Sequence, residues 1–129
     1  MVFIMENLCF HGEYIEPIKE GLKTSTIRRH FDGKVGDEIA AYETDTLLLG
    51  MSMFFGFLKI RSISYIRFDE IDKEIARTEG YLHEDLLKES LYKIYGDLED
   101  SSLLYYIVFE FHEKEGSDNN ENRGIKRKT

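Results

Sequence analysis

The 129-residue sequence contains one cysteine, one proline and no tryptophan. A single cysteine, Cys9, cannot form an internal disulfide, and thiols without a partner are typical of reducing compartments. Long apolar runs are also missing: the longest, residues 47–58, includes two glycines, whereas a membrane-spanning helix needs about 20 apolar residues. The first residues have no basic, export-type leader. We therefore expect a cytoplasmic protein that does not associate with membranes.

Basic residues are outnumbered by acidic ones, 17 to 25, which gives a formal net charge of -8. A protein that coats duplex DNA needs many lysines and arginines to displace phosphate counterions, so we do not expect that function. The cysteine and the four histidines have no recognised zinc-binding spacing, and the sequence has no phosphate-binding loop. No metal or cofactor is expected.

Composition changes sharply near the carboxyl end of the sequence. After Phe111 nearly all apolar residues disappear, and the chain ends in the basic stretch "RGIKRKT". Such a composition cannot bury enough apolar surface to fold. We predict one domain over residues 1–113 and a disordered charged tail over residues 114–129.

The apolar spacing and the turn residues predict an α+β domain. The last helix carries apolar Leu87, Leu91 and Ile94 at helical spacing. The long strand region contains candidate buried residues, Tyr65 among them. Gly56 in the same region indicates a bulge. Because regular alternation of strands and helices is absent, the sheet should be mixed or barrel-like. The expected elements are a short helix over 14–20, strands over 24–29 and 37–43, a long or bent strand pair over 51–68, helices opening at Asp69 and at 83, and a strand over 103–111.

The stretch "EGLKTSTIRRH" (20–30) concentrates basic and hydroxyl residues in an otherwise acidic chain. Gly21 permits a turn after the first helix, so we expect Lys23 to lie in this turn and the strand to follow it. Side chains alternate along a strand, which puts Thr24, Thr26 and Arg28 on one face and leaves Ile27 to face the core. The stretch is either a polar edge strand or the edge of a functional site.

Four segments together resemble one known family. The segments "IKEGLKTSTIR", "GKVGDEIAAYE", "TEGYLHEDLLKESLYKIYGD" and "LLYYIVFEF" resemble, in order and spacing, the activating-signal-cointegrator homology (ASCH) domain over residues 8–111. The resemblance implies a PUA-like small mixed β-barrel with flanking short helices, and RNA or a modified nucleoside as the partner. The chain is also similar to a small bacterial branch that hydrolyses the acetyl amide of N4-acetylcytidine. In that branch the catalytic residues correspond to Lys23, Thr26 and Glu79.

Two functions follow from this resemblance, and a third does not depend on it. In a binding protein, the ligand would contact a cleft lined by Lys23, Thr24, Arg28, Arg29 and Tyr81. In an amidohydrolase, Thr26 would be the nucleophile, Lys23 its base and Glu79 an acid or a stabilising group. A lysine has an ordinary pKa of about 10.4, so this second function requires burial or neighbouring cations that lower the pKa of Lys23. The acidic surface and the tail would instead suit a protein-interaction module.

Overall fold

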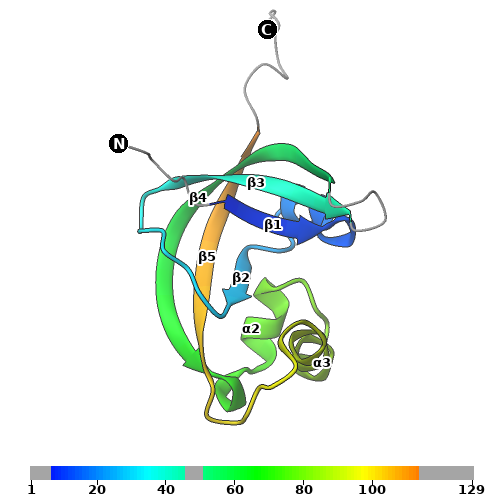
Figure 1. Cartoon of the computed structure of the whole chain (residues 1–129), viewed down its shortest axis with the longest axis vertical. Helices are drawn as coiled ribbons and strands as arrows, with labels where there is room; N and C mark the ends of the chain where they lie inside the picture. Colours follow the sequence, from blue (N-terminus) through cyan, green and yellow to red (C-terminus); the bar gives the residue numbers. More distant parts are fainter. Residues whose placement is uncertain (1–6, 46–50, 114–129) are drawn as a thin grey trace, which may run out of the picture.

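A curled five-stranded mixed sheet forms the frame of the molecule (Figure 1). The computed structural model describes residues 7–45 and 51–113, so the tail predicted over 114–129 lies outside the described residues. The strand order is β1-β3-β4-β5-β2; β1 and β3 are parallel, and the other neighbours are antiparallel. The predicted α+β class with a mixed sheet is confirmed. The strands are β1 (Asn7–His11), β2 (Ser25–Arg28), β3 (Glu38–Asp45), β4 (Met51–Arg67) and β5 (Leu103–Glu113).

Short helices fill the connections between the strands. Figure 1 shows α2 and α3 side by side next to β2, below the level of β1. None of the helices in the described ranges is long and apolar enough to cross a membrane. The helical segments are η1 (Gly12–Tyr14), α1 (Ile15–Lys19), η3 (Phe68–Glu70), α2 (Lys73–Thr78) and α3 (Glu84–Tyr95).

Strands β2 and β5 separate two hydrophobic cores because their side chains alternate between the two faces. Ile107 of β5 belongs to the core inside the curled sheet, together with Phe10 and Leu58. Ile27 of β2 and Leu104 of β5 belong to a second core, which lies against α2 and α3. The prediction that Ile27 faces the core is therefore confirmed. Ile27 therefore packs the edge strand β2 against the helices.

The end of α1 determines where the chain enters β2. Gly21 has a φ angle of 78° and follows the last helical turn, so it adopts the left-handed conformation that glycine tolerates best. The amide groups of Gly21 and Leu22 donate to the carbonyls of Ile18 and Pro17, at 3.2 and 2.9 Å. This pattern is a Schellman cap. The cap ends the helix and places Lys23 in the turn before β2, as the sequence predicts.

Three sequence expectations need correction. The helix expected to open at Asp69 begins at Lys73, because the side chain of Asp72 accepts a hydrogen bond from the amide of Ile75 and caps the helix there. The strand pair expected over 51–68 is one long strand, β4. The bulge predicted at Gly56 is confirmed in β4: Ala41 pairs with Gly56 and Tyr42 with Phe54, so the register skips Phe55. Tyr65, expected to be buried, is 64% exposed. Tyr65 packs on the ring of Tyr105 across the sheet instead.

The Schellman cap yields a first prediction. Gly21→Ala should destabilise the protein by about 1–2 kcal/mol, because alanine is strained in the left-handed conformation. Gly21→Asn, whose side chain tolerates this conformation, should cost less than Gly21→Ala. Urea unfolding of the two variants measures both effects. An alanine variant as stable as the wild type would show that the cap does not constrain this turn.

Candidate functional site

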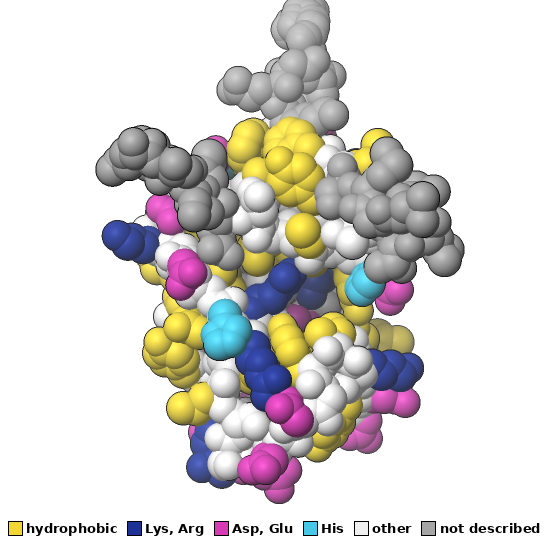
Figure 2. All heavy atoms as spheres, in the orientation of Figure 1, with side chains coloured by type: hydrophobic (Ala, Val, Ile, Leu, Met, Phe, Trp, Pro, Cys, Tyr) yellow, Lys and Arg dark blue, Asp and Glu magenta, His cyan; other side chains and the backbone are white. Residues whose placement is uncertain are grey.

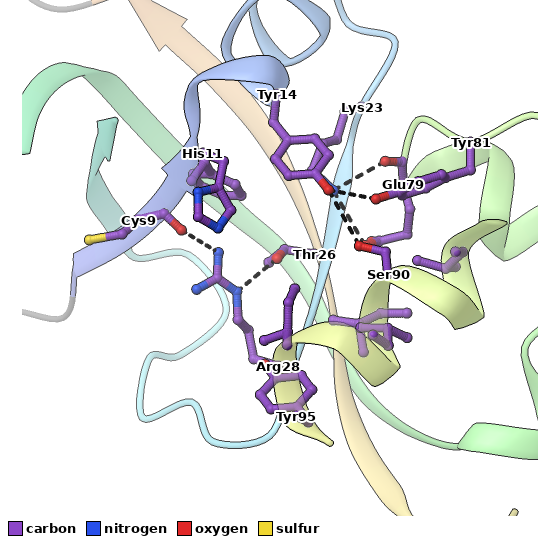
Figure 3. Close-up of a pocket in the computed structure, with 15 residues that line it drawn as sticks. Cys9, His11, Tyr14, Lys23, Thr26, Arg28, Glu79, Tyr81, Ser90 and Tyr95 are labelled. Atoms are coloured by element: carbon purple, nitrogen blue, oxygen red, sulfur yellow. Dashed lines mark hydrogen bonds and ion pairs between the residues drawn. The ribbon is translucent and has the colours of Figure 1, made fainter. Parts of the chain in front are cut away.

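The principal pocket lies where the β1 edge, the β2 edge and the helices α2 and α3 approach one another. Figure 2 shows this face hollowed at its centre, with Lys or Arg side chains inside the hollow. The pocket has a volume of about 170 Å³, and Figure 3 shows its polar side chains pointing toward one another from separate elements. The lining residues are Cys9, Phe10, His11, Tyr14, Lys23, Thr26, Ile27, Arg28, Glu79, Tyr81, Leu87, Ser90, Leu91, Ile94 and Tyr95.

A buried ion pair stands at the inner end of this pocket. The ammonium group of Lys23 lies 3.3 Å from Oε1 of Glu79 and also donates to the backbone carbonyl of Glu79 at 3.2 Å. The two residues are only 4% and 3% exposed. The positions are 56 residues apart in sequence. The two most distant parts of the predicted catalytic set are therefore in direct contact.

Glu79 occupies an electrostatically unfavourable place unless Lys23 is present. It is the C-cap of α2, and a carboxylate at a helix carboxyl end costs about 0.3–1 kcal/mol because of the helix dipole. Lys23 donates to the carboxylate and to the terminal carbonyl together, so one cation compensates both negative groups. A second Schellman cap, in which Gly80 and Tyr81 donate to Arg77 and Ala76, fixes Glu79 in this place.

Burial changes the acid–base behaviour of Lys23. Loss of solvent around the ammonium group lowers the pKa of Lys23 below its ordinary value, and Glu79 partly opposes this shift. The positive charge of Arg28 lowers the same pKa further, though more weakly. The ring of Tyr14 covers the ammonium group, with 5.2 Å between Nζ and the ring centroid. Lys23 thus meets the condition that the sequence reasoning set for a base, namely a lowered pKa.

Arg28 connects the two edges of the sheet across the pocket. Strands β1 and β2 stand at opposite ends of the strand order, and Nη2 of Arg28 donates to the carbonyl of Cys9 in β1 at 2.9 Å. Its Nε donates to the hydroxyl of Thr26 at 2.8 Å, and its guanidinium lies 4.9 Å from the centroid of the Phe10 ring. Because Arg28 supplies the donor, the Thr26 hydroxyl retains its own hydrogen for another acceptor.

Phenol groups close the other side of the pocket. The hydroxyl oxygens of Tyr14 and Tyr81 are 2.5 Å apart, and that of Tyr14 is 3.5 Å from Oγ of Ser90 in α3. Burial raises the pKa of Tyr81, so its hydroxyl is protonated at neutral pH and can donate. The predicted ligand-binding residue Tyr81 therefore lines the same pocket as Lys23, Thr26 and Glu79.

Two other predicted binding residues lie outside the lining of this pocket. Thr24 is half-buried, and its amide donates to the carbonyl of Thr78 at 2.7 Å. Arg29 turns to the carboxyl end of α3, where its guanidinium lies 2.7 Å from a carboxylate oxygen of Asp97 and 5.5 Å from the ring centroid of Tyr95. Arg28 ends β2 and Arg29 lies just after it, and the two guanidinium groups reach different partners, the carbonyl of Cys9 and the carboxylate of Asp97.

The sequence reasoning missed a chain of hydroxyl groups behind Glu79. Ser25, which is fully buried, donates to Oε2 of Glu79, and its oxygen lies 2.8 Å from the hydroxyl of Thr78. The hydroxyl of Thr78 is in turn 2.7 Å from that of Tyr106 in β5. Thr78 could have indicated this chain from the sequence: it is a polar residue three positions after Ile75, on the same side of the helix, and directly precedes Glu79. Within residues 7–45 and 51–113, no three acidic, histidine or cysteine side chains gather as metal ligands.

The buried ion pair yields a second prediction. Lys23→Met and Glu79→Gln should each destabilise the protein by about 3–5 kcal/mol, because each leaves a buried charged group without its partner. In the double variant neither charge remains, so its loss of stability should be clearly smaller than the sum of the two single losses. Urea unfolding of the four proteins gives this coupling.

An exposed pair provides the control. Arg77 and Glu74 approach to 3.5 Å in α2 with side chains that are mostly exposed, so Arg77→Met and Glu74→Gln should each cost less than about 1 kcal/mol and add nearly independently. Strictly additive losses for Lys23 and Glu79 as well would mean that the buried pair is not a coupled unit.

Comparison with solved structures identifies the fold. No family model and no curated protein match the sequence. A DUF984 protein of Enterococcus faecalis superposes with a TM-score of 0.65 at 15% identity, covering 88% of this chain and 80% of its own. An ASCH domain from Lactobacillus crispatus gives a TM-score of 0.62 at 14% identity, covering 84% and 82%. A mutant ASCH protein of Zymomonas mobilis gives 0.59 at 17% identity, covering 82% and 67%.

Each of these likenesses covers more than four fifths of this chain at 14–17% sequence identity, so it concerns the fold and not individual site residues. They bear on the backbone arrangement, which here is a curled mixed sheet with flanking short helices. The PUA-like small barrel predicted from the sequence is confirmed, and the chain has the fold of ASCH-domain structures.

Proposed function

We propose that this chain is an ASCH-type protein whose pocket binds a nucleobase, presented by a modified nucleoside or by single-stranded RNA. The observation that carries the proposal is the convergence of Lys23, Thr26, Arg28, Glu79 and Tyr81 on one pocket. The resemblance to the ASCH family points to Lys23, Thr26, Arg28 and Glu79, which are spread over 57 positions of the sequence. Such a convergence in a fold shared with ASCH structures supports a common ligand site.

The chemistry of the pocket suits a planar base with polar edges. Its volume of about 170 Å³ is below the roughly 300–1,000 Å³ of sites for larger organic ligands, so it matches one base rather than several. Hydroxyl, carboxylate and guanidinium groups supply both donors and acceptors for base edges, and Tyr14 and Tyr81 supply aromatic surface for stacking. Leu87, Leu91 and Ile94 form an apolar wall from α3.

Charge favours a ligand with few phosphates. The whole chain carries a formal net charge of -8, and inside the pocket Glu79 offsets Lys23 so that Arg28 supplies the remaining positive charge. A long nucleic acid would be repelled by the acidic surface, whereas a nucleoside or one segment of single-stranded RNA would meet only this local site.

Hydrolysis of N4-acetylcytidine is the second candidate, and the environment of Lys23 and Thr26 favours it. Lys23 has a lowered pKa, and Arg28 orients the Thr26 hydroxyl without using its hydrogen. In the proposed reaction, neutral Lys23 removes this proton as Oγ1 of Thr26 attacks the acetyl carbon. The carbon–nitrogen bond breaks, the proton goes to the N4 nitrogen of cytidine, and water then hydrolyses the acetyl-threonine to acetate.

Binding gives a third prediction. Lys23→Ala and Arg28→Ala should each weaken binding of N4-acetylcytidine or a short single-stranded RNA by about tenfold or more, because each removes a charged hydrogen-bond donor. Calorimetric titration measures the affinities. Lys59→Ala and Arg61→Ala, on β4 away from the lining residues, are the matched controls and should bind as the wild type does.

Stability has to be separated from binding in this experiment. Arg28→Lys keeps the charge but cannot reproduce the two separate contacts of the guanidinium, so it should fold and still bind more weakly. Unchanged titrations for both alanine variants would exclude this pocket as the ligand site.

Catalysis gives a fourth prediction. Wild-type protein incubated with N4-acetylcytidine should release equal amounts of acetate and cytidine, Thr26→Val should release neither, and Thr26→Ser should retain activity because it keeps a nucleophilic hydroxyl. Chromatography of the products gives the rates. If wild-type protein at high concentration releases no acetate, the hydrolytic function is wrong, while the binding function stands on its own titrations.

A further inference from the structure

A row of three large side chains leads from the pocket across neighbouring strands. Arg28 at the end of β2 pairs with Tyr105 of β5, and Tyr105 pairs with Tyr65 of β4. Figure 1 shows these three strands side by side. Residues that pair directly in antiparallel strands place their side chains on the same face of the sheet. Arg28 lines the pocket, whereas the two tyrosines lie just beyond its lining.

The tyrosines stand on the face of the sheet that also forms the pocket. Thr26 lines the pocket and pairs with Ile107, which belongs to the core inside the curled sheet. Tyr105, two residues before Ile107 in β5, packs against the same core. Because alternate residues of a strand share a face, Tyr105 and its partner Tyr65 continue the pocket side of the sheet.

Tyr65 presents an aromatic surface to solvent at the end of this row. Its ring centroid lies 4.8 Å from that of Tyr105, with the ring planes inclined by 52°, and the two hydroxyl oxygens are 3.5 Å apart. Tyr105 is half-buried and supports Tyr65 from one side, whereas Tyr65 itself is 64% exposed. A ring that one neighbour holds and that is otherwise exposed can receive a second planar group.

The spacing of the row suits consecutive nucleotides of one chain. Neighbouring strands lie about 4.8 Å apart, so the backbones of Tyr105 and Tyr65 are roughly 5 and 10 Å from that of Arg28. Bases of single-stranded RNA can be splayed apart and stacked singly on aromatic side chains of a sheet. A base in the pocket and a base on Tyr65 can therefore belong to adjoining nucleotides.

We propose that Tyr65 and Tyr105 form a stacking platform for the nucleotide next to the one in the pocket, so that the ligand is single-stranded RNA rather than a free nucleoside. The inference rests on the proposed function for the first base and assigns a place to the second. Tyr65 stacks on the base, and Tyr105 supports Tyr65. The negative charge of Asp32 acts on Tyr105, so the platform contacts a base and not a phosphate.

The size of the surface favours a nucleotide over a protein partner. The exposed apolar side chains here are those of Tyr65 and Leu103, with the half-buried Tyr105 between them in sequence position on β5 and β4. Arg67, which pairs with Leu103, is held by Asp69 at 2.8 Å and ends the apolar surface. A stable protein interface covers about 800 Å² on each partner, far more than three side chains offer.

Ligands of increasing length give the fifth prediction. Calorimetric titration of the full chain compares N4-acetylcytidine with the same nucleoside extended by one adenosine at either of its two ends. Extension at one end should raise the affinity by about fivefold or more, because a second base stacks on Tyr65. Tyr65→Leu should remove this gain and still bind the nucleoside as the wild type does, and Tyr65→Phe should keep the gain. An added nucleotide that lacks its base should give no gain.

Tyr92 offers a matched control for the loss of an exposed ring. It is 43% exposed on α3, packs on Phe68 and lies outside the lining of the pocket, so Tyr92→Leu should leave both affinities unchanged. No gain from extension at either end, or a gain that survives Tyr65→Leu, would overturn the proposal. A Tyr65→Leu change that alters only self-association in sedimentation would also overturn it, because the tyrosines would then contact a second copy.

The same titrations distinguish the platform from the pocket. If the nucleoside binds and its length makes no difference, the pocket is a nucleobase site and the platform is wrong. If the nucleoside does not bind but the extended ligand does, with an affinity that falls in Tyr65→Leu, the platform stands and the proposed function of the pocket is wrong. If no ligand binds, both are wrong.

Discussion

The buried contact between Lys23 and Glu79 is the interaction on which the arrangement of the pocket depends. Neither side chain would be stable alone in a place with almost no solvent, because an unpaired buried charge costs several kcal/mol. Two glycine-dependent helix caps, at Gly21 and Gly80, bring the pair together from α1 and α2. Local backbone conformation therefore delivers both partners, and their attraction joins the helices to the edge strand β2.

Around this pair the two edge strands of the sheet and the helices enclose a pocket. Arg28 spans from β2 to β1, Tyr14 covers the ammonium group, and α3 contributes an apolar wall. The pocket therefore combines a polar inner end with aromatic and apolar sides, which is the composition that a nucleobase requires. The lowered pKa of Lys23 adds a chemical property that binding alone does not need, and it is the reason to retain hydrolysis as the second function.

Much of the fold and part of the site could be predicted from the sequence because they depend on local rules. Gly21 predicted the cap of the first helix, Gly56 predicted the bulge, and the lack of regular alternation between strands and helices predicted the mixed sheet. Helix boundaries were less predictable: two acidic residues, Asp69 and Asp72, compete as caps, and only the hydrogen bond to Ile75 decides between them. The contact of Lys23 with Glu79 came from family resemblance, since no local pattern joins residues 56 positions apart. The partners of Arg29 and the hydroxyl chain through Ser25 depend on tertiary packing, which residue spacing does not encode.

The most direct test of the pocket as a nucleobase site is a nuclear magnetic resonance titration of the isotopically labelled full chain. N4-acetylcytidine and a short single-stranded RNA would be added separately while the side-chain signals of Lys23, Thr26 and Tyr81 are followed. Binding in the pocket predicts saturable shifts of these signals with either ligand, and unchanged signals for Arg61 on the far part of β4. Signals of Lys23, Thr26 and Tyr81 that stay fixed at saturating ligand, or shifts centred elsewhere, would contradict the assignment.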